Sequence, residues 1–392
     1  MIRDILEYSL NLPESPSLKE IFNEKLQEFG LSKTQFEKLA NIQRRSLDGI
    51  LDKTSKQTDV SNILKLGEFL GMPFDSLLAY HLKDRPVEEI KDLQDSIEIT
   101  FINRYFDLKT LSSLGFVDKK FTVDELKKRI CKFFKLSSIY EYESKLNEAL
   151  YSRTKRSFND KMKDFWIKSS YKYFELIDNQ NKYSREALKE LIPKIKPYTQ
   201  SVDKGLLTVF RALYNVGVTI VFQSMVPKTQ IRGATFLVNN KPCIVVTDLK
   251  KSYPTIWFSL LHELHHVLFD LEELKQIRYH LTGEPDLFLI HEDKANEFAS
   301  EYLISEEKMR YIEPLIHNHL MVCKFAKEMQ IHPSIIYSQF QYRQHEIGNN
   351  YWGAFTEHFP KIDSLGESLN KSNWDVESLE VAAQKIKNLL TV

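Results

Sequence analysis

Apolar residues recur at helical spacing through residues 18–80 and predict five short helices there. The first should end at Gly30 and the fourth at Gly71, because glycine readily takes the left-handed conformation that ends many helices. Ser32 is suited to cap the second helix, and Pro73 is suited to open the fifth. The pattern therefore predicts a compact helical unit near the N-terminus.

The next segment, residues 83–200, is polar, rich in aromatic residues and helical in its pattern. Lysines and arginines alternate with aromatic residues from Tyr151 to Phe174. Two interpretations are open: a nucleic-acid surface with interleaved aromatics, or an amphipathic helical connector with a solvated charged face. We favour the connector and expect it to end near Pro193 and Pro197.

From residue 201 the pattern changes to a helix followed by strands. Residues 216–222 are rich in β-forming residues, and a hairpin is expected over 235–247 with its turn at Asn239-Asn240. The helix that begins near Ser252 is apolar on almost every side. Since a helix with this pattern is normally buried, its few polar side chains need buried partners.

Those polar side chains spell His262-Glu263-Leu264-His265-His266, a match to HExxH. On a helix, His262 and His266 lie on one face and can bind one metal ion, with Glu263 beside the metal-bound water. This spacing is typical of zinc hydrolases, most often peptidases. A further helix, predicted over 292–304, begins with Glu292 and offers a third ligand. Two histidines and one glutamate leave the fourth zinc position open for water.

Three other side chains near the motif have expected roles. Asp270 lies one turn beyond His266 and is suited to orient its imidazole, although a solvated helix end is an equal alternative. Asn296 lies one turn beyond Glu292 and is a second such candidate. His265 should point away from the metal face.

Composition limits the partners, the metal ligands and the cellular compartment that we expect for the protein. Lys+Arg and Asp+Glu are both 54, so the net charge of zero favours no class of partner. Three scattered cysteines without a CxxC pair argue against disulfides and against a thiolate zinc site. Residues 1–10 contain acidic residues, and no apolar run approaches a membrane span of about 20 residues. We therefore expect a cytoplasmic protein that does not contact the membrane.

The run LSKTQFEKLANIQRRSLDGIL, followed by a helix and GMPFDSLL, is similar to the repressor-type helix-turn-helix of the Cro/C1 and XRE class. The resemblance implies that the second helix of the motif enters the DNA major groove. Asp48 and Asp52 would lie near phosphates, so a unit that serves only dimerisation or protein contact remains an alternative. The positions that match the DNA-reading residues of the class are Gln35, Gln43, Arg44, Arg45 and Ser46.

HELHH followed by E-x-x-A-N-x-F-A, after a β-hairpin, resembles the ImmA/IrrE family of metallopeptidases over residues 201–345. The resemblance implies that zinc is bound by His262, His266 and Glu292, with Glu263 as the general base. Family members often carry an XRE-type helix-turn-helix on the same chain. This sequence departs from the family at His265, where glycine is usual, and at Lys294, where an acidic residue or glutamine is usual.

The sequence thus predicts a multidomain, mainly α protein with a zincin-like α+β domain that contains a small sheet. The two resemblances imply a DNA-binding regulator that cleaves a protein partner or repressor in a stress, prophage or toxin–antitoxin setting, and analogy with repressor-type modules implies a homodimer. The alternative is a non-enzymatic antitoxin or repressor whose zincin-like domain binds a toxin or senses a ligand. The expected domains are 1–82 (helix-turn-helix), 83–200 (helical connector), 201–345 (peptidase) and 346–392 (tail with a terminal helix).

Overall fold

A computed structural model describes residues 2–12, 16–52, 54–55, 58–83, 87–144, 160–227, 229–282 and 292–391. The chain forms two compact units, Met1–Phe101 and Ile102–Val392. The early part of the predicted basic and aromatic stretch, up to residue 159, lies outside the described residues. No helix in the described ranges combines the length and the apolar character needed to cross a membrane.

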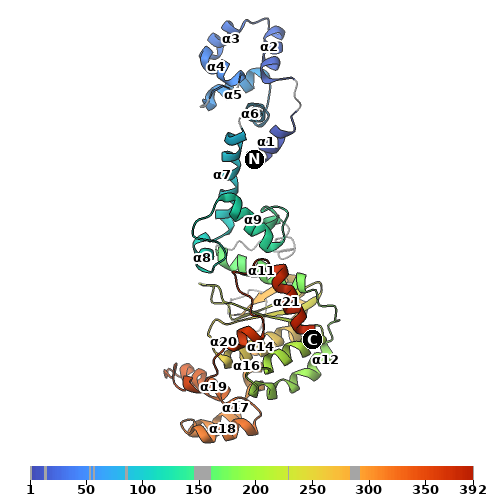
Figure 1. Cartoon of the computed structure of the whole chain (residues 1–392), viewed down its shortest axis with the longest axis vertical. Coiled ribbons are helices and arrows are strands. Elements are labelled where there is room, and N and C mark those ends of the chain that lie inside the picture. The colour runs from blue at the N-terminus through green and yellow to red at the C-terminus, as the bar shows by residue number, and fades with distance from the viewer. Residues whose placement is uncertain are drawn as a thin grey trace. The chain divides into compact units, whose positions relative to one another are not determined.

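The first unit is helical (Figure 1), and the five helices predicted over residues 18–80 are confirmed. Ser32 caps the second of them, and its hydroxyl accepts a hydrogen bond from the backbone N–H of Gln35. An additional helix precedes the five and packs through Ile5 against Ala79. The helices are α1 (Ile2–Leu10), α2 (Leu18–Glu28), α3 (Lys33–Ala40), α4 (Arg44–Leu51), α5 (Val60–Leu70), α6 (Phe74–Leu82) and α7 (Val87–Tyr105), of which α7 contains the division between the units.

The core of the first unit consists of the apolar positions that define the helical pattern. Phe22, Phe36 and Phe69 form a cluster in which the ring centroids of Phe36 and Phe69 lie 4.3 Å apart. Asn41 ends α3 in the left-handed conformation, with φ of 50°, and so turns the chain toward α4. Gly71 ends α5 in the same conformation. The tight turn at Asn41, between α3 and α4, keeps the N-terminal end of α4 at the surface.

The second unit contains the sheet and the remaining helices. The strands are β1 (Thr219–Gln223), β2 (Gly233–Val238), β3 (Lys241–Thr247) and β4 (Tyr279–Leu281). The α-helices are α8 (Leu108–Ser113), α9 (Val123–Phe134), α11 (Lys161–Ile177), α12 (Arg185–Leu191), α13 (Gly205–Asn215), α14 (Tyr253–Phe269), α15 (Leu271–Ile277), α16 (Glu292–Leu303), α17 (Glu306–Ile312), α18 (His319–Glu328), α19 (Pro333–Glu346), α20 (Asp363–Ser368) and α21 (Leu379–Thr391). Short 3-10 helices are η1 (Ile192–Lys194), η2 (Lys196–Gln200), η3 (Glu313–Leu315) and η4 (Thr356–His358).

The sheet has the strand order β1-β3-β2-β4, in which β1 is parallel to β3, and β2 is antiparallel to both β3 and β4. The predicted hairpin is confirmed, and Asn239 and Asn240 both have positive φ in its turn. Side chains alternate between the two faces of β2. Phe236 contacts Trp166 of α11 on one face, while Thr235 contacts α14 on the other. Figure 1 shows the strands between α11 with α21 and α14 with α16.

Helix α11 differs from the connector that the sequence predicted. Most of its residues are buried, and it packs against β2 and α21 as part of the same unit as the sheet. Lys168 is 1% exposed, because its ammonium lies 3.0 Å from Asp164 and 4.0 Å from the centre of the Tyr142 ring. The solvated charged face expected here is therefore wrong for α11. Pro193 and Pro197 likewise lie inside η1 and η2 of this unit, not at a domain boundary.

The C-terminal tail completes the face of the sheet that α11 covers. Helix α21 packs along α11, and Trp374 packs against Phe165 at a ring distance of 5.4 Å. The guanidinium of Arg129 on α9 donates hydrogen bonds to the backbone carbonyls of Trp374, Val376 and Glu377. The boundaries expected at residues 200 and 345 thus cut through one compact unit, which runs from Ile102.

Candidate metal centre

Helix α14 carries the HELHH motif through the middle of the second unit. Ser252 precedes its first turn and Pro254 lies within it, as the sequence predicted. The helix is packed between the sheet and α16, so the motif is buried: His262 is 1% exposed and His266 is 0% exposed. Their Nε2 atoms are 3.2 Å apart. The i,i+4 spacing therefore brings the two imidazoles together.

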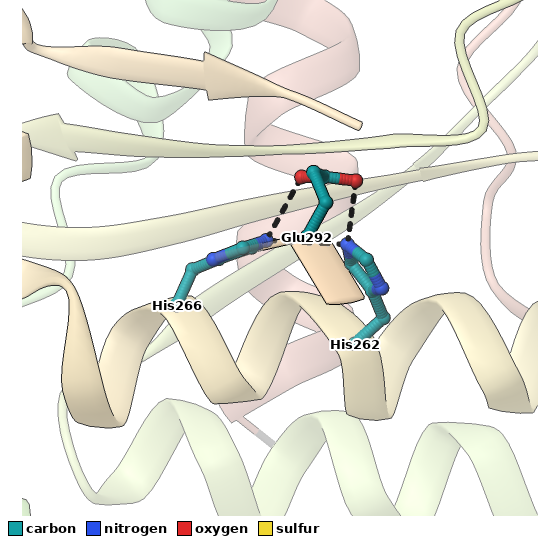
Figure 2. A group of neighbouring side chains, drawn as sticks. All are labelled: His262, His266 and Glu292. Carbon is teal, nitrogen blue, oxygen red and sulfur yellow. Dashed lines mark hydrogen bonds and ion pairs between the residues drawn. The ribbon is translucent and has the colours of Figure 1, made fainter. Parts of the chain in front are cut away.

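Glu292 approaches both imidazoles from the first residue of α16 (Figure 2). Its Oε2 lies 3.5 Å from His262 Nε2, and its Oε1 lies 3.5 Å from His266 Nε2. The fully buried Ala295 and Ala299 face α14 from α16, and their small side chains let the two helices approach closely. The sequence-predicted ligand set is thus brought together in one cluster.

The separations within this cluster fit a zinc ion. Ligand atoms about 2.1 Å from a tetrahedral zinc lie about 3.4 Å from one another. The two Nε2 atoms are 3.2 Å apart, and each lies 3.5 Å from one oxygen of Glu292, Oε2 for His262 and Oε1 for His266. Two neutral imidazoles and one carboxylate are also the donor set of many catalytic zinc sites, which keep a fourth position open. The residues present therefore fit a zinc ion in donor type and in spacing.

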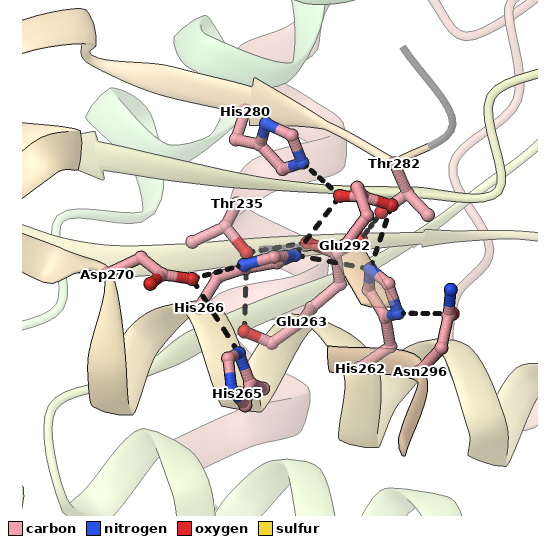
Figure 3. Close-up of polar contacts among 10 residues, drawn as sticks. All are labelled: Thr235, His262, Glu263, His265, His266, Asp270, His280, Thr282, Glu292 and Asn296. Atoms are coloured by element: carbon pink, nitrogen blue, oxygen red, sulfur yellow. Dashed lines mark hydrogen bonds and ion pairs between the residues drawn. The ribbon is translucent and has the colours of Figure 1, made fainter. Parts of the chain in front are cut away.

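Each imidazole is oriented through its other ring nitrogen (Figure 3). The Nδ1 atom of His266 lies 2.7 Å from Asp270 Oδ2, and the Nδ1 atom of His262 lies 3.0 Å from Asn296 Oδ1. An acceptor at Nδ1 places the proton there and leaves the Nε2 lone pair directed into the cluster. Both residues that the sequence suggested for this purpose, Asp270 and Asn296, are thus found beside a candidate ligand.

The same contacts set the protonation of the metal-free cluster. Burial disfavours the charged form of His266, but hydrogen bonds to Asp270 and Glu292 raise its pKa to about 9. Burial would raise the pKa of Glu292, yet hydrogen bonds from three histidines hold it well below its usual range. Burial would raise the pKa of Asp270, yet the nearby imidazole of His265 and the hydrogen bond with His266 hold it well below its usual range. The metal-free site is therefore an imidazolium held between carboxylates.

This charge state predicts that zinc affinity depends on pH. Below about pH 9, zinc must displace the proton on His266, whereas Glu292 and Asp270 are already ionised. Apparent zinc affinity should therefore rise roughly tenfold per pH unit between about pH 7 and pH 9, as measured by competition with a chelator. Asp270→Asn removes one group that stabilises the protonated form of His266. The zinc affinity of this variant should therefore stop rising at a lower pH than that of the wild type. A wild-type affinity that is constant over this range would contradict the assignment.

Glu263 turns from the helix toward the sheet and is completely buried. The hydroxyl of Thr235 on β2 donates to its Oε2 at 2.6 Å, and the hydroxyl of Thr282 donates to its Oε1. A Cβ atom at Gly233 would lie only 2.5 Å from Glu263 Oε1, so the close approach of this carboxylate requires glycine there. Two hydroxyls and a glycine thus fix the position of the carboxylate.

His280 belongs to the site although the sequence analysis did not find it. It is paired with Thr235 across β2 and β4, so both side chains project from the same face of the sheet. Its Nε2 lies 2.5 Å from Glu292 Oε1, and its ring centroid lies 4.7 Å from that of His266. Strand β4 spans only three residues and carries no motif spacing. Only the cross-strand register with β2 reveals the role of His280.

His265 lies beside Asp270, outside the cluster formed by His262, His266 and Glu292. It is 6% exposed, and its Nδ1 is 3.6 Å from Asp270 Oδ2. Its ring packs against Phe269 and Phe298, with centroids 4.8 and 5.6 Å away. His265 therefore supports the carboxylate that orients His266, and it is absent from the His262–His266–Glu292 cluster, as the sequence predicted.

The residues expected to contact DNA lie on the first unit, at and near the start of α4. Gln43, Arg44 and Arg45 are exposed, and Ser46 is half-buried. The side-chain oxygen of Gln35 accepts hydrogen bonds from the backbone N–H and hydroxyl of Ser32, which leaves its amide NH₂ for other contacts. These side chains therefore form an accessible polar surface around the N-terminus of α4.

A small mixed sheet, a buried HExxH helix and a glutamate from the following helix define a metallopeptidase-like domain. The model of the peptidase M78 family, described as the IrrE N-terminal-like domain, matches residues 215–355. The match includes the whole sheet, α14, α16 and α19, and thus every residue of the cluster. Comparisons with curated proteins and with solved structures found no match.

Proposed function

We propose that this protein is a zinc-dependent endopeptidase joined to a DNA-binding unit, and that it cleaves a protein partner or repressor. The observation that carries the enzymatic half is the cluster of His262, His266 and Glu292, whose separations suit zinc, with Glu263 held beside it. The family match over residues 215–355 supports the same reading. Its resemblance to ImmA/IrrE proteins favours a stress, prophage or toxin–antitoxin setting in the cytoplasm.

Each side chain of the site has a distinct task in peptide hydrolysis. When bound to the three ligands, zinc supplies a Lewis acid that activates water and polarises the substrate carbonyl. Glu263 accepts a proton from the attacking water on its carboxylate and passes it to the leaving nitrogen. Thr235 and Thr282 hold that carboxylate in place. His280 and Asn296 fix Glu292 and His262, so little reorganisation is needed on binding.

Zinc content and hydrolysis together test this proposal. The purified chain should bind one zinc ion per molecule and cleave peptides in a mixed-sequence library, as followed by mass spectrometry. Removal of zinc with a chelator should abolish cleavage, and stoichiometric zinc should restore it. A zinc-loaded chain that cleaves neither the library nor proteins encoded beside it would instead favour the non-enzymatic antitoxin or ligand sensor.

The DNA-binding half of the proposal is supported by the charges around α4. The two acidic residues expected near phosphates are paired with lysines: Asp48 with Lys33, and Asp52 with Lys19 at 2.7 Å. These ion pairs reduce the repulsion that the two carboxylates would exert on DNA. Arg44 and Arg45 remain exposed at the start of the helix. Their guanidinium groups suit base edges and phosphates.

We predict that Arg44→Ala combined with Arg45→Ala weakens binding to the chain's own promoter at least about tenfold. The measurement is fluorescence anisotropy with labelled promoter DNA over a range of salt concentrations. The double variant should also show a shallower salt dependence, because fewer counterions are released. Lys324→Ala with Lys327→Ala, two exposed lysines on α18, is the matched control and should bind as the wild type does. Equal binding by all three chains would refute the assigned DNA surface.

A further inference from the structure

A cavity of about 690 Å³ lies beside the N-terminal end of α14. Its walls are formed by the start of β2, the loop before α14, helix α19 and the chain that follows α19. The volume is within the range of specific ligand sites and has room for several amino-acid side chains. The residues that give it its character are Arg232, Lys250, Lys251, Tyr342, Trp352 and Lys361.

The cavity is positively charged without local compensation. Four of its lining side chains are lysine or arginine, and no carboxylate lines it among the described residues. Asp248, two residues before Lys250, directs its carboxylate to Lys371 at 2.9 Å and to the backbone N–H of Met225. A recess lined by charges of one sign concentrates ligands of the opposite sign. The lining therefore selects an anionic ligand.

The cavity lies on the same face of α14 as the candidate metal centre. Thr255 lines the cavity and precedes His262 by seven residues, which is two helical turns or about 10 Å along the axis. An extended peptide covers this distance in about three residues. Aromatic contacts join the two places: Trp352 to Tyr342 at 5.1 Å, Tyr342 to Phe258 at 6.4 Å, and Phe258 to His262 at 6.2 Å. The cavity and the cluster thus share a continuous wall.

The sheet edge beside the cluster suits an extended ligand. Among the described residues, β4 pairs only with β2 and is the edge strand of the sheet, the position at which an extended peptide can add as a further strand. At the end of β4, the backbone N–H of Thr282 donates to the carbonyl of Gly233, which directly follows the cavity residue Arg232. A polypeptide laid along this edge would thus continue toward the cavity. This continuity favours a peptide over a separate small molecule.

We propose that the cavity is a substrate subsite that binds an acidic segment of the cleaved protein, about three residues from the scissile bond. Aspartate or glutamate side chains would meet Arg232, Lys250, Lys251 and Lys361, while Tyr342 and Trp352 cover the apolar parts of the same segment. This inference rests on the proposed peptidase function, because it deepens the specificity of that site.

The test measures binding separately from hydrolysis. Zinc-loaded Glu263→Gln chain is titrated with two labelled twelve-residue peptides that are identical except that one carries aspartate and glutamate where the other carries lysine. The acidic peptide should bind at least tenfold more tightly, and this preference should shrink as salt increases. Lys250→Glu with Lys251→Glu, made in the same background, should weaken binding of the acidic peptide at least tenfold.

Two controls separate the subsite from a general charge effect. Lys324→Glu with Lys327→Glu makes the same charge change on α18, outside the cavity, and should leave peptide affinity unchanged. Lys250→Gln with Lys251→Gln should show an intermediate loss, with an unfolding temperature close to that of the parent chain. Equal affinity for the two peptides would overturn the proposal. The proposal would also be overturned if the cavity substitutions left the affinity for both peptides unchanged, or if ATP bound in place of the acidic peptide.

The cleavage pattern of the wild-type chain tests the proposed distance between the acidic segment and the scissile bond. In the mixed-sequence library, acidic residues should be enriched about three positions from the cleaved bond, and Lys250→Glu with Lys251→Glu should remove that enrichment by raising KM more than it lowers kcat. Cleavage with no acidic preference would overturn the subsite alone. Selective binding of the acidic peptide without any cleavage would retain the subsite and reject the peptidase.

Discussion

Glu263→Gln should reduce peptide cleavage by about a thousandfold or more while leaving zinc binding intact. Glutamine has the shape of glutamate, and the hydroxyls of Thr235 and Thr282 can both donate and accept hydrogen bonds, so the side chain should keep its place. An amide cannot accept the proton of the attacking water, however. Initial cleavage rates, together with the zinc content of the purified variant, measure the two effects separately.

Glu297→Gln is the matched control for this substitution. Glu297 is an exposed glutamate on α16, and it is absent from the His262–His266–Glu292 cluster. Its replacement removes the same charge from the same domain and should leave the rate within about twofold of the wild type. If Glu263→Gln cleaved as fast as this control, Glu263 would not be the general base.

Glu292→Ala should weaken zinc binding by roughly a thousandfold. Zinc in a protein site contributes about 10–16 kcal/mol of binding free energy, so one of three ligands carries a share of roughly 4 kcal/mol. Zinc should then raise the unfolding temperature of the wild type, because it binds the folded state, and should fail to do so for the variant at the same concentration. Chelator competition and thermal unfolding with and without zinc provide the measurements.

His280→Ala extends this prediction to the residue that the sequence did not reveal. His280 contacts Glu292 and lies outside the three-ligand group, so its loss should weaken zinc binding by only about 10–100-fold. His317, an exposed histidine that belongs to no cluster of potential metal ligands among the described residues, serves as the control, and His317→Ala should retain wild-type affinity. A loss at His280 as large as that at Glu292 would make His280 a ligand instead of a positioning residue.

The sequence predicted those parts of the site that local spacing determines. The i,i+4 histidines, Glu263, and the orienting residues Asp270 and Asn296 each lie one turn from a ligand or next to one. Glu292 required a second helix, and the small residues at Ala295 and Ala299 indicated which side of that helix packs closely. The hairpin followed from its Asn-Asn turn, and the five N-terminal helices followed from their spacing and caps.

The remaining parts depend on contacts between distant segments, which no local pattern encodes. Thr235 and His280 are 45 positions apart and meet only through the β2–β4 register. Lys168 belongs to a basic stretch, yet its pairing with Asp164 and its position over Tyr142 allow it to be buried. Helix α11 therefore has the composition of a surface helix and the burial of a core helix, and the sequence-based connector was wrong there.

The packing of α21 on α11 also affects the order in which the protein matures during synthesis. The ribosome completes α14 and α16 many residues before it reaches α21, which buries Leu379, Ile386 and Leu390. Burial of three such side chains contributes roughly 5–9 kcal/mol, a sum comparable with the whole stability of a typical domain. A nascent chain that lacks α21 therefore carries His262, His266 and Glu292 in a domain whose core is incomplete. The proposed metal centre should therefore reach its full stability only after α21 has been translated and has packed on α11.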